Sequence, residues 1–236
     1  MRRRVIAAAV LIAFAVIAAT FPMRLALTLA GAERSGLSAR EVRGSVWAGE
    51  LVEARLGGLA LGNVEASLSP LALLGGDVEL AFARADARLG DLSGRLHGSA
   101  PRGVSDLSGS SSLSGGLGLM PVDSLRFEGA EVRFDDGGRC VAAGGRVQLT
   151  VRASIAGLDL SRGLSGPLRC VEGRAQAALV SQSGMERLTL SFDGSGAYRA
   201  AFAIDVNRDP AMAAMLSTLG FRAGNGGFVL VTSGRL

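Results

Sequence analysis

The chain has 236 residues, which is enough for one large all-β domain or two small ones. Its residues are 48% apolar but only 5% aromatic, and 34 of them are Gly, a composition that favours many short strands and tight turns over a helical bundle. All 25 basic residues are Arg; three stand at the N-terminus and the other 22 are balanced by 21 acidic residues, so no basic stripe supports nucleic-acid binding.

The N-terminal segment combines a basic flank with an apolar run. The flank consists of Arg2, Arg3 and Arg4. Residues 5–21 carry no charged side chain and would reach about 26 Å as a helix. Arginines on this flank alone predict a cytoplasmic tail at residues 1–4, a transmembrane signal-anchor at residues 5–23 and an exported body. The alternative is a cleaved signal peptide, for which Ala30-Gly31-Ala32 offers a small-x-small site.

From residue 39 onward the apolar pattern has period two, as in half-buried strands. The alternation is clear at residues 52–56 and 64–68, and Pro70 ends the second of these strands. Gly57-Gly58 and Gly62-Asn63 are interpreted as reversals, because Gly and Asn adopt positive φ readily. Further strands are expected at residues 78–82 and 87–96.

The second half repeats this pattern after a stretch rich in Gly and Ser. Residues 98–121 are interpreted as a weak strand followed by a loop. The β domain over residues 39–236 is therefore either undivided or made of two lobes, at about 39–100 and 122–236. Strands are predicted at residues 125–134, 147–151, 175–180, 188–192, 198–206 and 227–233, with a hairpin turn at 135–138.

One short helix is predicted near the C-terminus. Asp209 can cap it, Pro210 suits its first position and Gly220 suits a left-handed residue after its end. Its apolar stripe consists of Met212, Met215, Leu216 and Leu219. The predicted fold class is therefore mainly β: an N-terminal transmembrane helix, then a curled, glycine-rich antiparallel β-meander with one short C-terminal α-helix.

The two cysteines, Cys140 and Cys170, are 30 residues apart and lie beside predicted strands. In an exported body an even number of cysteines indicates a disulfide, and the alternative is a pair of buried free thiols. A ring of that size would stabilise the fold by about 3.5–4 kcal/mol. A zinc site is excluded, because two Cys and a single His cannot fill four ligand positions.

The sequence offers no set of residues for catalysis or cofactor binding. It has no Lys for a phosphate loop or a Schiff base and no G-x-S-x-G segment, and His97 is its only His. We therefore expect a protein that is not an enzyme and has no catalytic, cofactor-binding or metal-binding residues. An envelope hydrolase has only the many Ser and acidic residues in its support.

Two groups of short motifs resemble a known family. Gly44-Ser45-Val46-Trp47, Leu61-Gly62-Asn63-Val64 and Leu68-Ser69-Pro70 follow one another early in the body, and the cysteines, Asp209-Pro210 and a Gly-Phe pair follow later. In this order they resemble type II secretion system protein N, the N component of the general secretion pathway, over nearly the whole chain. The motif residues are Gly44, Trp47, Gly49, Gly62, Leu68, Ser69, Pro70, Asp209, Pro210, Gly220 and Phe221.

The resemblance implies a non-enzymatic accessory component of the machinery that exports folded proteins across the outer membrane. It implies an anchor in the bacterial inner membrane, a cytoplasmic N-terminus and a periplasmic body. The expected partners are other type II secretion components, such as the inner-membrane platform and the outer-membrane secretin. The edges of the predicted sheet can accept a partner's strand. Trp47 has no chemistry around it and is interpreted as a core anchor.

The alternative function is lipid handling by a periplasmic protein with an AsmA-like curled sheet, an architectural similarity only. In that case apolar side chains of two predicted strands would line an open groove. These are Val78, Leu80, Phe82, Leu188, Leu190 and Phe192.

Overall fold

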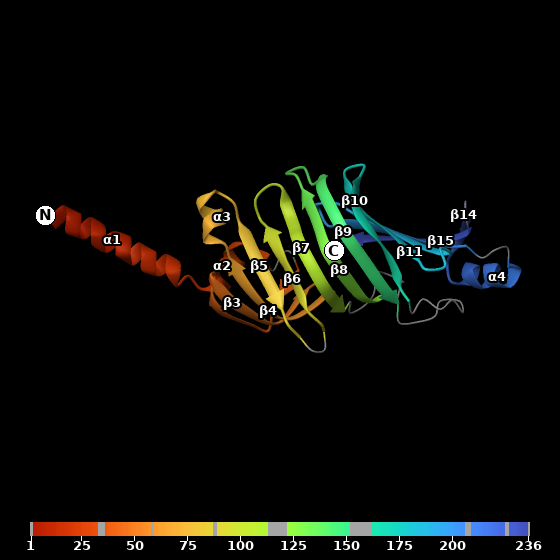
Figure 1. The fold of residues 1–236 in the computed structure, drawn as a ribbon, viewed down its shortest axis with the longest axis horizontal. Coiled ribbons are helices and arrows are strands. Elements are labelled where there is room, and N and C mark those ends of the chain that lie inside the picture. Colours follow the sequence, from red (N-terminus) through yellow and green to blue (C-terminus); the bar gives the residue numbers. More distant parts are fainter. Residues whose placement is uncertain are drawn as a thin grey trace.

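The structure is a computed structural model that describes residues 2–32, 36–57, 59–86, 89–112, 122–151, 162–205, 209–224 and 227–235. Helix α1 (Arg2–Ala19) projects from one end of an elongated body, and α2 (Met23–Leu29) follows where α1 meets that body (Figure 1). Two further short helices are α3 (Pro70–Leu74) near this end and α4 (Pro210–Thr218) at the opposite end. No helix of the described residues is long and apolar enough to cross a membrane.

Within the described residues, the body is one antiparallel sheet of fifteen strands. They are β1 (Leu37–Ser38), β2 (Glu41–Ser45), β3 (Ala48–Leu56), β4 (Leu59–Leu68), β5 (Glu79–Arg84), β6 (Leu92–His97), β7 (Arg102–Ser112), β8 (Val122–Phe134), β9 (Cys140–Val151), β10 (Leu164–Val171), β11 (Arg174–Ser181), β12 (Glu186–Phe192), β13 (Ala197–Ile204), β14 (Arg222–Gly224) and β15 (Gly227–Arg235). From β3 to β13 each strand pairs with the next along the chain, while β1 and β2 both pair with β3, and the sheet ends in the order β13-β15-β14. The predicted antiparallel meander is confirmed.

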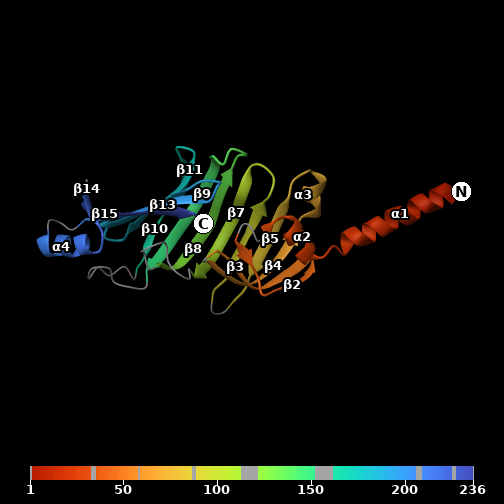
Figure 2. The same ribbon diagram turned by 180° about the vertical axis from the view of Figure 1, so that it is seen from behind.

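The sheet curls, so that strands that are not neighbours meet. Ser111 Oγ in β7 donates a hydrogen bond of 2.7 Å to the carbonyl of Ala60 in β4, although β5 and β6 lie between them in the sheet. The β8–β9 turn likewise meets the β12–β13 turn, where Gly194 N donates to Gly138 O at 3.0 Å. From both sides of the molecule, strands β13 and β15 are seen to pass across β8 and β9 (Figures 1 and 2).

Apolar side chains form two separate cores along this sheet. The first core lies in the N-terminal half and consists of Met23, Val46, Leu51, Ala54, Val64 and Ala66. The second core is larger and draws on strands β8–β13 with α4. Within it the rings of Phe202 and Phe221 pack edge to face, as do Phe134 and Phe192, each pair with centroids 6.1 Å apart. The lobe boundaries predicted from the sequence stay a prediction.

The predicted disulfide is confirmed: Cys140 at the start of β9 and Cys170 near the end of β10 are bonded. The two strands are neighbours in the sheet, and the ladder between them runs from Leu164↔Leu149 to Pro167↔Arg146. The bridge thus fastens β9 to β10 beyond the end of this ladder, beside the second core.

A buried arginine holds the curl of the N-terminal half. Arg84 is at the end of β5, and its side chain reaches carbonyls from β4, from the turn before β6 and from β7. The acceptors are Ala60 (3.4 Å), Leu61 (2.7 Å), Leu89 (3.1 Å), Gly90 (2.9 Å) and Ser110. Burial lowers the pKa of this guanidinium, and the charges of Asp86 and Asp91 oppose that effect.

One sequence prediction about turns was wrong, and another was correct but incomplete. Gly62-Asn63 is not a reversal but lies within β4, opposite a bulge in β3. Gly62 has φ +73°, and Asn63 Oδ1 accepts a 3.0 Å hydrogen bond from the backbone N–H of Glu53 on the bulged strand. Ser69-Pro70 ends β4, as predicted, but it also starts α3, because Ser69 Oγ accepts from Ala72 N and Pro70 takes the first helical position.

The predicted C-terminal helix is confirmed as α4. Asp209 Oδ1 accepts from Ala211 N and Met212 N at 2.9 and 3.2 Å, and Gly220 has φ +89°. The predicted apolar stripe is wrong in part. Leu216 is fully buried and Met212 packs on the second core, but Met215 and Leu219 are exposed, because the helix touches the sheet along a narrower line than the stripe.

Candidate functional site: the helix junction and the sheet edges

The early motif residues join α1 to the sheet. Trp47 Nε1 donates to the carbonyl of Ala18 at 2.8 Å, and Val46 N donates to the carbonyl of Phe21 at 3.0 Å. Pro22 forms a β-bridge with Ser45 at the end of β2. Trp47 is half-buried against the first core, so it fixes the end of α1 as well as anchoring the first hairpin.

The motif Leu68-Ser69-Pro70 meets the Trp47 motif at the same place. Leu68 N donates to the carbonyl of Val46 at 2.8 Å, and Ser69 N donates to the carbonyl of Glu79 at 2.9 Å. Gly49 is needed here for space, since a Cβ on it would lie 2.9 Å from Met23 Cγ of α2. These residues form what we call the helix junction: the end of α1, α2, the β2–β3 turn and the start of α3.

The later motif residues lie elsewhere. Asp209, Pro210, Gly220 and Phe221 frame α4 at the far end of the body, where Phe221 N donates to Leu216 O at 3.1 Å and the Phe221 ring packs on Phe202. The structure therefore does not bring the two motif groups into one site. Each group shapes the end of the sheet to which it belongs.

His97, the only histidine of the sequence, contacts a serine and an arginine. His97 Nε2 lies 2.8 Å from Ser105 Oγ, but Ser105 is buried. The same Nε2 also lies 3.5 Å from Arg133 Nη2, whereas a catalytic triad has a carboxylate bonded to the other ring nitrogen, Nδ1. Within the described ranges, no three His, Cys, Asp or Glu side chains gather in a way that could hold a metal ion.

The proposed lipid groove is not assembled. Leu80 and Phe82 of β5 pack against the first core, whereas Leu190 and Phe192 of β12 pack against the second. Leu188 is fully buried in the second core. Five of the six side chains predicted to line a groove are thus divided between two cores, and the sixth, Val78, is 41% exposed.

The N-terminal edge of the sheet is charged. On β2, Arg43 Nε and Nη2 bind the two carboxylate oxygens of Glu41 at 2.8 and 2.7 Å, and Arg40 pairs with Glu53 at 3.1 Å. The hydrogen bonds from Arg43 lower the pKa of Glu41, and Glu41 in turn raises the pKa of Arg43. Charged side chains of this kind protect an edge strand from pairing with another chain.

The C-terminal edge has no such protection. Strand β14 covers β15 only from Gly227 to Val229; beyond this, among the described residues, no strand pairs with the outer side of β15. The segment Phe228–Gly234 carries no charge and no Pro. Phe228 and Leu230 pack against the second core, while Val231 is 46% exposed. We call residues 230–235 the open edge.

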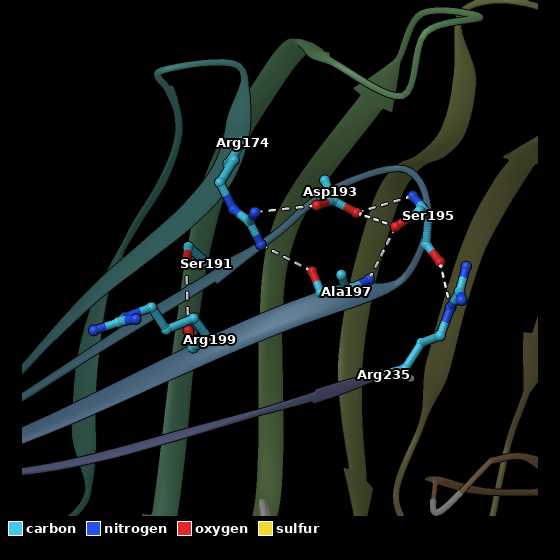
Figure 3. A network of polar contacts seen from close by, with 7 residues as sticks. All are labelled: Arg174, Ser191, Asp193, Ser195, Ala197, Arg199 and Arg235. Atoms are coloured by element: carbon cyan, nitrogen blue, oxygen red, sulfur yellow. Dashed lines mark hydrogen bonds and ion pairs between the residues drawn. The ribbon is translucent and has the colours of Figure 1, made fainter.

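A polar network holds the end of the open edge in place (Figure 3). Asp193 Oδ1 accepts hydrogen bonds from Ser195 Oγ at 2.6 Å and Ser195 N at 3.0 Å, and its other oxygen pairs with Arg174 at 3.1 Å. Arg235 Nε donates to the carbonyl of Ser195 at 3.1 Å, which ties β15 to this turn. The Ser195 hydroxyl, and after it the Ser195 amide and Arg174, hold the pKa of Asp193 below its ordinary value.

An open depression of about 610 Å³ adjoins the open edge. Ser233 and Gly234 of β15 form one side of it, and polar side chains of β11 and β13, such as Arg174 and Arg199, form much of the rest. The arrangement offers unpaired main-chain groups in a row, with a polar surface beside them. Such a site can bind an extended segment of another chain by strand addition.

The sequence analysis missed two features, the buried side chain of Arg84 and the open edge. Arg84 follows Leu80 and Phe82 at alternate positions of β5, so strict alternation already places its side chain on the same, inward face of the strand. For the open edge, the sequence gives a run of apolar residues at 227–231 but does not say which strand is last in the sheet. That depends on β14 turning back to cover only part of β15.

Comparison with known protein families identifies a relationship for most of the chain. No curated protein and no solved structure matches the chain. A family model described as type II secretion system protein N matches residues 35–231, which takes in every strand of the body, β15 in part. The matched region contains the helix-junction motifs, the disulfide and α4. The chain belongs to the family of type II secretion system protein N.

Proposed function

We propose that the protein is a non-enzymatic component of type II secretion that acts by binding another component of the machinery at its open edge. Family membership makes it an accessory component of this system. The observation that carries the rest is the outer side of β15 at residues 230–234, which carries no charge and has no strand partner among the described residues. Arg235 ties the end of this strand to Ser195, and Leu230 packs on the second core. An edge of this kind invites strand addition unless a partner covers it.

The proposed location is the inner membrane, with the N-terminus in the cytoplasm and the body in the periplasm. The apolar side chains of α1, such as Leu11 and Phe14, are exposed around the helix and pack on nothing in the body. Arg2, Arg3 and Arg4 stand at its outer end, as expected for a cytoplasmic flank. A Cys140–Cys170 disulfide suits the oxidising periplasm.

The partner is proposed to be an extended segment of the inner-membrane platform or of the outer-membrane secretin. Affinity capture of the tagged full-length protein, after cross-linking in cells, tests this directly. We expect a type II secretion component in the captured material, and its complete absence would overturn the proposed function.

Two matched variants test the role of the edge. Val231→Lys places a charge on the open edge, and Val141→Lys places the same charge on β9, an interior strand of the sheet, where the valine is 53% exposed. We expect Val231→Lys to reduce capture of the partner several-fold and Val141→Lys to leave it unchanged. If both variants captured the partner equally well, the protein would still be a secretion component, but its binding surface would not be the open edge.

A further inference from the structure

The most exposed large apolar side chains outside α1 gather on two short helices. Leu29 of α2 is 80% exposed, and Leu71 and Leu74 of α3 are 79% and 86% exposed. All other large apolar side chains of the described body are markedly less exposed. Leucines presented this openly indicate a surface that is covered by something apolar.

These two helices adjoin the end of α1. Helix α2 starts at Met23, four residues after the last residue of α1. Helix α3 is linked to the same point by consecutive backbone hydrogen bonds, from Val46 N to Phe21 O and from Leu68 N to Val46 O. Figure 1 shows α2 and α3 at the end of the body from which α1 departs. The exposed leucines therefore belong to the end of the body from which α1 departs.

The polar residues nearby fit a lipid headgroup layer. Residues 66–76, which include α3, carry no charged side chain, so nothing in this segment opposes contact with acyl chains. Arg24 on α2 is exposed and can reach phosphate groups while the leucines point toward the acyl chains.

The length of α1 brings this surface to the bilayer. Its apolar part, residues 5–19, reaches about 22 Å at 1.5 Å per residue. The hydrocarbon layer is about 30 Å thick, so an inserted α1 draws the residues that follow it into the interface. Trp47, bonded to Ala18 O, lies at this level too, where indoles are favoured.

We propose that α2 and α3 form a second membrane contact, in which Leu29, Leu71 and Leu74 insert into the headgroup and acyl boundary of the bilayer and Arg24 binds lipid phosphates. The proposal rests on the anchoring by α1 proposed above. Its consequence is that the body is held against the membrane in a fixed orientation, and does not swing freely on α1. The occupant of this surface is lipid, not a second protein chain.

Fluorescence quenching in vesicles tests the contact. Because Cys140 and Cys170 are bonded to each other and are the only cysteines, one introduced cysteine is the only free thiol. Leu71→Cys reports on α3, Ile12→Cys on α1, and Met215→Cys on α4 at the far end of the body, where the side chain is also exposed and helical. Each full-length variant is labelled with an environment-sensitive dye and reconstituted, at about one protein per vesicle, in phosphatidylethanolamine and phosphatidylglycerol with nitroxide-labelled lipid.

We expect the label at position 71 to be quenched at least about threefold more strongly than the label at position 215, with most quenching from nitroxides near the headgroups. The double variant Leu71→Cys with Leu74→Glu should lose this quenching. If position 71 is quenched no more than position 215 while position 12 is strongly quenched, the anchor stands and the second contact is wrong. If position 12 is not quenched, the proposed anchor is wrong, and quenching at position 71 alone would then show that α3 binds lipid without it.

Discussion

The two halves of the sheet are stabilised by different means. In the C-terminal half, large side chains such as Phe202, Leu188 and Ile204 are almost completely removed from solvent, and a disulfide fastens β9 to β10. In the N-terminal half the core is small, and much of the curl depends on hydrogen bonds from Arg84 and Ser111 to backbone carbonyls. The half with the larger core therefore presents the open edge, and the half with the smaller core carries the helix junction.

Apolar burial and hydrogen bonding stabilise the two halves in different ways. Apolar burial in the second core stabilises the fold without requiring one exact geometry. The hydrogen bonds of Arg84 stabilise it only while all the carbonyl acceptors keep their positions. We therefore expect the N-terminal half to open before the C-terminal half when the fold is destabilised.

The largest effect should come from emptying the second core. Phe202→Ala removes a buried ring that packs edge to face on Phe221, and should lower the free energy of unfolding by about 3–5 kcal/mol. Urea denaturation of the full chain in detergent, followed by hydrogen exchange of β10–β13, measures the loss. Val231→Ala, at an exposed position, is the matched control, and a similar loss in both variants would contradict the assignment of the core.

Removal of the disulfide should come next. Cys140→Ser combined with Cys170→Ser releases a loop of 30 residues, which should cost about 3.5–4 kcal/mol through the entropy of the unfolded chain. The loss should be confined to the transition of the C-terminal half. Protein taken from cells and unfolded without reductant should also show no thiol labelling; labelling of both cysteines there would contradict the bridge and the periplasmic location together.

Loss of the Arg84 hydrogen bonds should affect the other half. Arg84→Met keeps much of the side-chain volume but leaves buried carbonyls without donors, and should cost about 2–4 kcal/mol. Amide exchange should accelerate in β4–β7 and stay unchanged in β10–β13. Arg95→Met, which removes an exposed arginine from the neighbouring strand, should do neither. A uniform acceleration over both halves would refute their separate stabilisation.

The smallest effect concerns pH. The pKa of Asp193 is lowered in the folded protein, so its ion pair and hydrogen bonds stabilise the fold above the ordinary value of about 3.8, and this contribution is lost as the pH falls through the lowered pKa. Since the group is near the surface, Asp193→Asn should cost only a few tenths of a kcal/mol near pH 7. The difference between wild type and variant should vanish at about pH 2, which thermal unfolding across that range can measure.

The sequence predicted most of the meander because alternation, glycine turns and Asp209-Pro210 are local signals. The errors arose where tertiary contacts overrule them. Gly62-Asn63 has the chemistry of a turn, but the β3 bulge at Glu53 uses it within a strand. Alternation places Arg84 on the inward face of β5, but only the curl of the sheet surrounds it with carbonyls from β4 and β7.

The functional surfaces were harder to predict than the fold. The motif around Trp47 was recognised as part of the family pattern, yet its bond to Ala18 requires the end of α1 to lie against the turn between β2 and β3. The open edge depends on which strand ends the sheet and on how far β14 covers it. Both are properties of the assembled sheet, which no short segment of sequence encodes.

The central claim is that the open edge binds a type II secretion component. The most direct measurement is site-specific photo-cross-linking in cells that carry the secretion machinery, with the reactive side chain at Val231 on the open edge or at Val141 on β9. The account predicts an adduct with a platform or secretin subunit from position 231 and none from position 141. No adduct from position 231, or equal adducts from both positions, would contradict it.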